Sequence, residues 1–327
     1  MELPVPCGPV SALMSDLIRG ARPAARPPLP GRPVLADRDV QLALWTAYEL
    51  SFRGFDDVDD GQEWDPEVLR LRSEIEGRLE AELRDVTRDR VEQVSDQEPI
   101  GTRLLQLVEE AEGPHLSAYL RRDASAEQMT DFLRERSVQQ LKESDPQSFL
   151  LPRLEGAAKV ALAEIQYDEY GAGRAENLHQ TLFARALDAV GLDASYGAYV
   201  GEVSAVSLAS ANVMSLFGLN RRLRGAGVGH FAAFEASSSV PSRRIVAGLE
   251  RLGMPAAAAT YFSEHVEADS VHEQVAARDL CGALVSQYPS LYRDVVFGAV
   301  CALHLDALSG AELLARWASD VPTQEAS

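Results

Sequence analysis

The fold class of this chain is decided by residues 66–83, which read PEVLRLRSEIEGRLEAEL. Apolar side chains recur in this stretch at intervals of three and four residues, namely Val68, Leu69, Leu71, Ile75, Leu79 and Leu83. That spacing places most of them on one face of a helix with 3.6 residues per turn. The stretch therefore predicts an amphipathic α-helix that buries its apolar face against other elements.

The same spacing recurs along the chain from about residue 37 onwards. It is seen at Val40, Leu42, Leu44, Trp45, Tyr48 and Leu50. We expect further helices at about 99–112, 125–142, 147–190, 197–217, 228–238, 241–252, 255–284 and 288–316. Alternating Val/Ile/Thr segments bounded by Asn-Gly or Asp-Gly turns are missing from the sequence, so strands are not expected. The pattern predicts an all-α protein.

The domain organisation follows from the composition. Residues 21–33 read ARPAARPPLPGRP, and proline fixes extended backbone that offers little to bury. We therefore expect a Pro/Arg-rich tail or surface strap over residues 1–36 and a C-terminal tail over residues 321–327. Residues 37–320 are predicted to form a single domain, with accessory helices at about 37–95 and a core at about 99–316.

Length, charge and cysteine content limit the function classes. The chain has 327 residues, 46% of them hydrophobic, which is ample material for a core. A net charge of −19 has the wrong sign for nucleic acid or an anionic membrane. Three cysteines without a CxxC pair give neither a disulfide framework nor a cysteine zinc site. Prolines and an acidic residue interrupt the first 23 residues, so no signal peptide is expected, and a cytoplasmic location fits best.

One segment combines residues of metal-ligand type. Residues 261–272 read YFSEHVEADSVH. On a helix, Asp269 lies about 40° from His265 and His272 about 20° to the other side, so the three side chains share one stripe. Imidazole and carboxylate together suit iron, manganese or zinc, and helical bundles build metal centres from such inward-facing side chains. The alternative is a solvated polar face with histidines there by chance.

A second candidate segment runs from Glu164 to His179. Glu169 and His179 are ten residues apart, which places them about 80° off a shared face in an ideal helix. Gly171 and Gly173 lie between them and make a local distortion of the π-bulge kind easier.

Two further acids stand alone near helical stretches. Glu143 lies at the end of one stretch, in the sequence LKESDP, and Glu235 lies inside the apolar run FAAFE. A lone buried acid must be paired, protonated or bound to a metal. An exposed face or a charge at a helix N-terminus would account for either residue equally well.

The order of these residues resembles the haem-oxygenase-like di-iron oxidases and oxygenases, also called iron-containing redox enzymes. The resemblance rests on Glu143, on the sequence EIQYDEYG with Glu169, on His179 and Glu235, and on the closing His265-x3-Asp269-x2-His272. The sequences YELSFRGF at 48–55 and EWDP at 63–66 are similar to the N-terminal helices of many members, although Ser51 stands where relatives often have histidine. The resemblance covers about residues 40–285. It implies a haem-oxygenase-like helical bundle with additional N-terminal helices.

The resemblance also implies a ligand set and a metal. Two iron ions, bound as Fe(II), would be held by Glu143, His179, Glu235, His265, Asp269 and His272. Glu169 is similar to the extra carboxylate of members that oxygenate amine nitrogen. An added anionic ligand makes the iron pair more electron-rich, which favours oxygen transfer to a nucleophilic amine. Members of the family hold iron weakly.

The implied activity is O2-dependent N-oxygenation of a small amine, such as an amino acid side chain or an amino-heterocycle. The products would be hydroxylamine, nitroso or nitro compounds of specialised metabolism. Such an enzyme needs an external electron donor, for example a reductase or ferredoxin, and the resemblance implies a homodimer. One alternative is oxidative C–C cleavage or decarboxylation of an amino or fatty acid, and another is a metal-binding scaffold without turnover.

Residues around the predicted ligands offer support for them. A ligating imidazole usually gives its other N–H to a carboxylate or carbonyl, and the sequence offers Asp168, Glu176, Glu264, Glu267 and Glu273. Tyr167, Tyr170 and Tyr261 are expected to line the pocket or to serve in packing. Arg174 and Arg278 are candidates for binding a substrate carboxylate, with surface salt bridges as the alternative.

Overall fold

The computed structural model describes residues 1–23, 26–29, 31 and 33–319, without the side chains of 267–270. Across these residues the regular structure is helical and contains no strand, which confirms the predicted all-α class. The helices are α1 (Pro9–Ile18), α2 (Arg38–Glu49), α3 (Pro66–Gln93), α4 (Ile100–Glu109), α5 (Leu116–Arg122), α6 (Ala126–Gln140), α7 (Asp145–Ser148), α8 (Gly156–Glu169), α9 (His179–Ala189), α10 (Ala205–Leu219), α11 (Arg224–Arg251), α12 (Ala256–Gln274), α13 (Gly282–Gln287) and α14 (Tyr292–Ser319). A π-helical segment, Val275–Cys281, joins α12 to α13.

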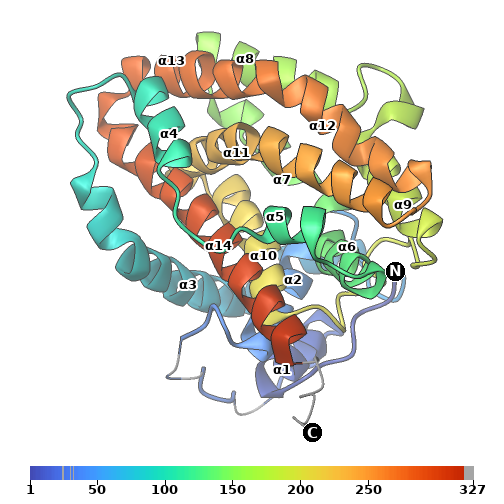
Figure 1. The fold of residues 1–327 in the computed structure, drawn as a ribbon. Helices are drawn as coiled ribbons and strands as arrows, with labels where there is room; N and C mark the ends of the chain where they lie inside the picture. Colours follow the sequence, from blue (N-terminus) through green and yellow to red (C-terminus); the bar gives the residue numbers. More distant parts are fainter. Residues whose placement is uncertain (24–25, 30, 32, 320–327) are drawn as a thin grey trace, which may run out of the picture.

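The long helix α11 lies at the centre of the molecule and packs against α12, α14 and α5 (Figure 1). Glycines allow α11 and α14 to approach closely. A Cβ atom on Gly229 would come within 1.9 Å of the Val295 carbonyl oxygen, and one on Gly298 would come equally close to the Ala226 carbonyl. Because only glycine fits at these two positions, the crossing point of the two helices is fixed by the sequence.

The last helical stretch, Pro289–Ser319, has the length and mean hydropathy of a membrane span. However, 61% of its most apolar window is buried inside the protein, because α14 packs on α11, α3 and α10. A central helix of a packed bundle has this character without any membrane.

The helix predicted over residues 66–83 is present as part of α3. Asp65 accepts hydrogen bonds from the backbone N–H groups of Glu67 and Val68, and Pro66 occupies the first helical position. Both features are typical of a helix N-terminus. The apolar face predicted from the sequence is buried, apart from the partly exposed Leu69, and packs toward α2, α1 and α14.

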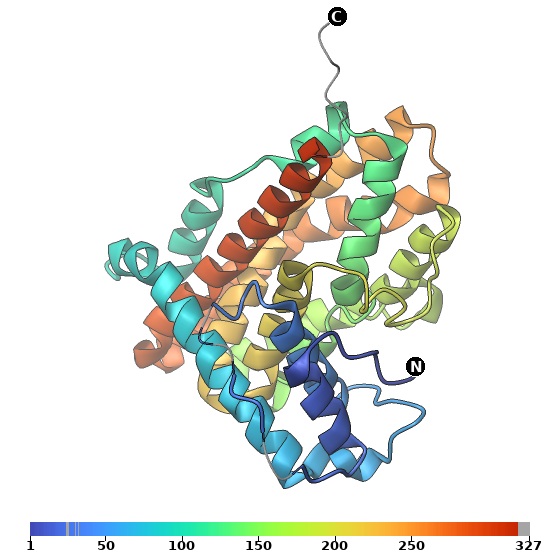
Figure 2. The ribbon, with the colours of Figure 1, turned by 90° about the horizontal axis from the view of Figure 1, so that it is seen from below.

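The prediction of a tail over residues 1–36 is wrong for residues 9–18. These residues form α1, whose apolar side chains Val10, Leu13, Met14, Leu17 and Ile18 are buried in one cluster with those of α2 and α3. The carboxylate of Asp39 in α2 accepts hydrogen bonds from the backbone N–H groups of Val10 and Ser11, at 2.8 and 2.7 Å. A helix N-terminus that is capped by another helix is tied to it, and Figure 2 shows α1 lying beside α2 and α3.

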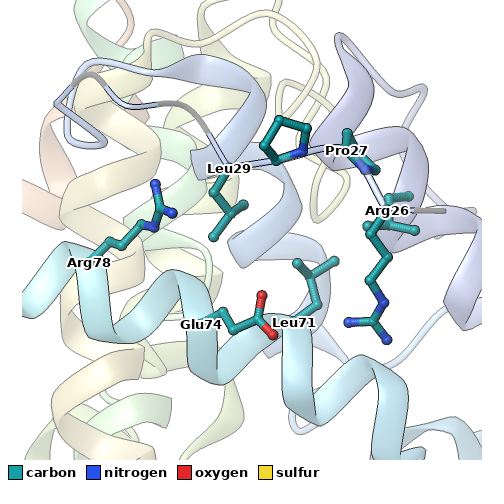
Figure 3. Close-up of a pocket in the computed structure, with 8 residues that line it drawn as sticks. Arg26, Pro27, Leu29, Leu71, Glu74 and Arg78 are labelled. Atoms are coloured by element: carbon teal, nitrogen blue, oxygen red, sulfur yellow. The ribbon is translucent and has the colours of Figure 1, made fainter.

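The described part of the Pro/Arg-rich run is exposed or partly exposed. Arg26, Pro27 and Leu29 face Leu71 and neighbouring residues of α3 across a surface hollow of about 450 Å³ (Figure 3). The guanidinium of Arg26 pairs with Glu67 of α3. The predicted C-terminal tail, 321–327, lies outside the described residues.

Two predicted helix boundaries need correction. The stretch 147–190 is not one helix but is divided among α7, α8 and α9, and the break after α8 contains Gly171, Ala172 and Gly173, all with positive φ. Conversely, the stretches 228–238 and 241–252 form one helix, α11, with Pro241 inside it. Proline removes one backbone donor, and packing on both sides of α11 overrides that local penalty.

Candidate metal centre

Six of the seven predicted ligands converge in the interior of the bundle, between the turn after α6 and helices α8, α9, α11 and α12. All six side chains are buried: Glu143, Glu169, His179, Glu235, His265 and His272. Their ligand atoms form two groups, each with all atoms within 4.8 Å of one another. The first group consists of Glu143, Glu169, His179 and His265, and the second group consists of Glu169, Glu235 and His272. The side chain of Asp269, the seventh predicted ligand, lies outside the described residues.

In the first group, the two imidazoles face the carboxylates of Glu143 and Glu169. The Nδ1 atom of His179 lies 3.0 Å from Glu169 Oε2 and 4.0 Å from Glu143 Oε2. The Nε2 atom of His265 lies 3.5 Å from Glu143 Oε1. These separations leave the donor atoms around one point, as a bound cation requires.

In the second group, one imidazole faces two carboxylates. The Nδ1 atom of His272 lies 3.3 Å from Glu235 Oε2 and 3.7 Å from Glu169 Oε1. The two oxygens of Glu169 therefore face different groups, with Oε2 toward the first and Oε1 toward the second. A carboxylate in this position can bridge two metal ions.

The chain brings Glu169 and His179 together by ending one helix and starting another. Glu169 is the last residue of α8 and His179 is the first residue of α9. In the turn between them, Gly171 has φ +79°, and a Cβ atom there would lie 2.3 Å from the Arg174 carbonyl oxygen. The predicted bulge is therefore a full helix break at a position where only glycine fits, and this break removes the 80° mismatch of a continuous helix.

Glu143 reaches the site from a strained turn. Residues 141–144 follow α6, and Ser144 has φ 69°, in the left-handed region that residues other than glycine rarely adopt. The hydroxyl of Ser144 donates to Glu169 Oε2 at 3.0 Å, and its carbonyl accepts a hydrogen bond from Gln166 Nε2. Backbone strain beside ligands is characteristic of functional sites.

Hydrogen bonds select which nitrogen of each α12 histidine faces a group. The His265 Nδ1 atom lies 2.8 Å from the backbone carbonyl of Tyr261, which can only accept, so Nδ1 carries the proton and Nε2 is left for the first group. In His272 the arrangement is reversed, because Nε2 lies 3.2 Å from Asp168 Oδ2 and Nδ1 faces the second group. Such outer hydrogen bonds orient ligating imidazoles and raise their basicity.

Tyr261 also supports the first group through its hydroxyl. The hydroxyl lies 2.8 and 2.9 Å from the two oxygens of Glu143 and donates to this carboxylate. Gln140 Nε2 in turn donates to the Tyr261 oxygen at 2.8 Å. The orientation of the Glu143 carboxylate is therefore fixed by a buried chain of hydrogen bonds.

The carboxylates and imidazoles of the two groups shift one another's pKa values. Burial raises the pKa of Glu169, but the neighbouring His179, His265 and His272 outweigh it and lower this pKa to about 2. Burial lowers the pKa of His272, but Glu235, Asp168 and Glu169 raise it to about 9. Carboxylates kept ionised in the interior need a positive partner, which protons on imidazole supply when a metal ion does not.

The donor set fits a divalent transition metal. Within the described part of the chain, Glu169 Oε1 is buried without a hydrogen-bond partner. His179 Nδ1 is buried too and makes no hydrogen bond, although it lies 3.0 Å from Glu169 Oε2. Buried polar atoms are normally satisfied, and two atoms lacking partners in facing groups point to a missing ligand. Carboxylate oxygens and imidazole nitrogens suit iron, manganese and zinc, so the residues present fit iron.

Among the predicted supporting residues, Asp168 contacts a ligand and Tyr261 contacts two. Sequence reasoning did not find Ser144, Gln140 or Gln180. Ser144 donates to Glu169 and Gln180 to the Glu143 carbonyl, and Gln140 donates to Tyr261, which in turn supports Glu143. A signal was present for Ser144, because the sequence LKESDP places a serine between a candidate ligand and an Asp-Pro turn. Nothing in the sequence distinguishes Gln140 and Gln180 from surface glutamines.

Helical bundles build metal centres from carboxylates and imidazoles on facing helices, and the two adjoining groups have this composition and placement. The family model described as iron-containing redox enzyme matches residues 130–307, more than half of the chain. The chain belongs to this family of iron-containing redox enzymes. The matched range includes all seven predicted ligands and leaves α1, α2 and α3 outside.

One characterised relative is similar over part of the chain. It is nitrosourea synthase from Streptomyces achromogenes subsp. streptozoticus, with 30% identity over 133 residues. The match covers 41% of this chain and 28% of the relative, so the chain spans well under half the length of that protein.

Proposed function

We propose that this protein is a di-iron, O2-dependent oxygenase that transfers oxygen to the nitrogen of a small amine. The observation that carries the proposal is the position of Glu169, whose two oxygens face the two groups. Because one carboxylate serves both groups, two iron ions would lie next to each other and act as one centre. Iron held there would supply the activation of O2.

The ligands proposed for the two ions are the predicted seven. His179, His265 and Glu143 would hold one ion, Glu235 and His272 the other, and Glu169 would contact both. We add Asp269 to this set from the sequence resemblance, because it lies on the same helix between His265 and His272. The chain positions these ligands before metal arrives, since the hydroxyl groups of Tyr261 and Ser144 already orient Glu143 and Glu169.

The choice of an amine as substrate is supported by polarity and by the relative. Residues adjoining the ligands include the buried amides of Gln140 and Gln166 and the hydroxyl of Ser144, whereas a fatty acid would need a long apolar tunnel. The name of the relative, nitrosourea synthase, describes a product with oxidised nitrogen. The polar surroundings disfavour a fatty acid as substrate, and the name of the relative favours N-oxygenation over C–C cleavage.

The reaction also requires an electron source. Conversion of R–NH2 with O2 to R–NHOH and water consumes two electrons and two protons, so an external donor such as a reductase or ferredoxin is part of the proposal. Further rounds would give nitroso or nitro products. We also propose a homodimer, from the resemblance alone, and a cytoplasmic location, from the cysteine content.

The test begins with an anaerobic Fe(II) titration of metal-free protein, for which we expect saturation at two ions per chain. The loaded protein is then mixed with reductant, labelled ¹⁸O2 and a panel of amino acids and amino-heterocycles. We expect an N-hydroxylated product that carries the label, detected by mass spectrometry. Unlabelled aldehyde, alkene or CO2 as the products would replace the proposal with oxidative C–C cleavage, and failure to bind iron would contradict both.

A further inference from the structure

Gln180 joins the two chain segments that carry ligands of the first group. It directly follows His179 at the start of α9, and its side chain is buried. The Gln180 Nε2 atom donates to the main-chain carbonyl of Glu143 at 2.8 Å. A single side-chain amide therefore links the backbone next to His179 to the backbone of Glu143.

Arg53, which lies just beyond the end of α2, fixes the orientation of that amide. Its guanidinium donates to Gln180 Oε1 at 2.5 Å and to the Leu141 carbonyl at 3.2 Å. Because arginine only donates, it requires the oxygen of the amide on its own side, which turns Nε2 toward Glu143. The guanidinium also stacks on the ring of Tyr196, 4.0 Å from its centroid, so its own position is restricted.

A buried ion pair holds the same turn to α2 at a second point. Lys142, next to Glu143 in the sequence, places Nζ 3.5 Å from Glu49 Oε2 in the protein interior. Glu49 also accepts the hydroxyl hydrogen bond of Tyr196 at 2.7 Å, and the ring of Phe52 lies 4.6 Å from Lys142 Nζ. A buried pair of this kind is costly to break from one side, so it resists displacement of the turn.

We propose that Arg53 and Gln180 form a clamp that sets the separation of Glu143 and His179 and thereby the metal affinity of the first group. Both are positioning residues, because they act through the ligand backbones and contact no ligand atom. Arg53 lies outside residues 130–307, so the N-terminal helices take part in the metal centre and are more than an accessory layer. The inference rests on the metal centre of the proposed function.

The clamp is tested by titrating metal-free protein with Co(II) alone, followed by the visible absorption of the bound ion. Gln180→Leu removes both hydrogen bonds of the amide, and Arg53→Met removes the guanidinium while keeping an unbranched side chain. In each variant we expect one of the two Co(II) ions to bind about 10- to 100-fold more weakly, with an altered absorption band, as is typical when outer-shell partners of ligands are lost. Arg53→Lys keeps one donor and should restore part of the affinity.

Arg38→Met is the matched control, because Arg38, at the start of α2, is also an arginine that donates to backbone carbonyls. Its acceptors, at Val200 and Val203, carry no ligand. We expect Arg38→Met to lower the thermal midpoint as Arg53→Met does, but to leave both Co(II) affinities and the spectrum unchanged. If Gln180→Leu does not fold, the clamp is tested by comparing the Co(II) affinities of Arg53→Lys and Arg53→Met. Affinities and spectra equal to wild type in the clamp variants would refute the clamp, whereas a wild-type protein that binds no Co(II) would refute the proposed function itself.

Discussion

The first and second metal groups differ in what holds their ligands in place. In the first group, Glu143 is oriented by the hydroxyl of Tyr261, a side chain that is only 2% exposed. In the second group, His272 is oriented by Asp168, whose side chain is 49% exposed. A hydrogen bond in a dry environment is stronger and holds its partners more firmly than one in contact with water.

This difference predicts that the two metal ions of the proposed centre are not equivalent. The first group is shaped by buried hydrogen bonds before metal arrives, so binding there costs little reorganisation. The second group depends on a support that water can compete with. We therefore expect the first group to bind metal more tightly, and this expectation is open to four experiments.

The largest effect is expected for Glu169→Ala, because Glu169 belongs to both groups. Its removal should weaken binding of both ions by more than about 100-fold, above the usual loss for an outer-shell partner. The measurement is a Co(II) titration, with far-ultraviolet circular dichroism to show that the helices persist. Retention of two tight sites would show that Glu169 is not a ligand shared by the two groups. The metal affinities of the two groups could then not be compared as those of one joined centre.

His265→Ala and His272→Ala should separate the two groups. His265 contacts only the first group and His272 only the second, so each variant should retain one of the two sites. We expect the tight site to be lost in His265→Ala and the weak site in His272→Ala, measured as stoichiometry and affinity in the same titration. Loss of the same site in both variants would mean that the two histidines of α12 bind the same metal ion.

The two supporting residues give a smaller and graded effect. Tyr261→Phe removes one buried hydroxyl and should weaken the first site by about 10- to 100-fold, while Asp168→Asn should weaken the second site by about tenfold or less. The phenylalanine variant keeps the ring packing against Phe183 and Phe262. Any change in metal affinity can therefore be assigned to the lost hydroxyl group and not to a change in the fold. Equal losses in the two variants would show that exposure of the supporting residue does not matter.

The sequence allowed the helices and most ligand candidates to be predicted, for physical reasons that are visible in particular residues. Helical periodicity depends on local spacing, so α3 and the shared stripe of His265 and His272 could be read directly. The candidate ligands Glu143, Glu169, His179 and Glu235 were predicted as a set from the resemblance to a known family, because their burial cannot be read from the residues themselves. The grouping of Glu169 with both sets could not be predicted, because it depends on tertiary placement.

What could not be predicted depends on contacts between distant segments. The helix α1 was missed because the prolines around it dominate the local composition, whereas its stability comes from burial against α2 and α3. A bulge was expected after Glu169, whereas the helix ends there. Glycine permits either a bulge or a helix end, and only packing with distant segments decides which one forms. Arg53 and Gln180 are 127 residues apart, and no periodicity links two polar residues at that separation.

The fourth experiment concerns acid, and it is needed to compare the two groups at different pH values without confusing metal release with unfolding. Burial lowers the pKa of His230, on the same helix as Glu235, from 6.5 to about 4. The unfolded chain therefore takes up a proton on this residue at a higher pH than the folded chain does. Stability from neutral His230 is complete above pH 6.5 and is lost as the pH falls toward 4, by about 2 kcal/mol at pH 5. Urea unfolding of metal-free protein at pH 7 and pH 5 should show this loss, and His230→Gln should reduce the pH difference by about that amount. An unchanged pH difference in His230→Gln would assign the acid sensitivity to the ligand cluster itself.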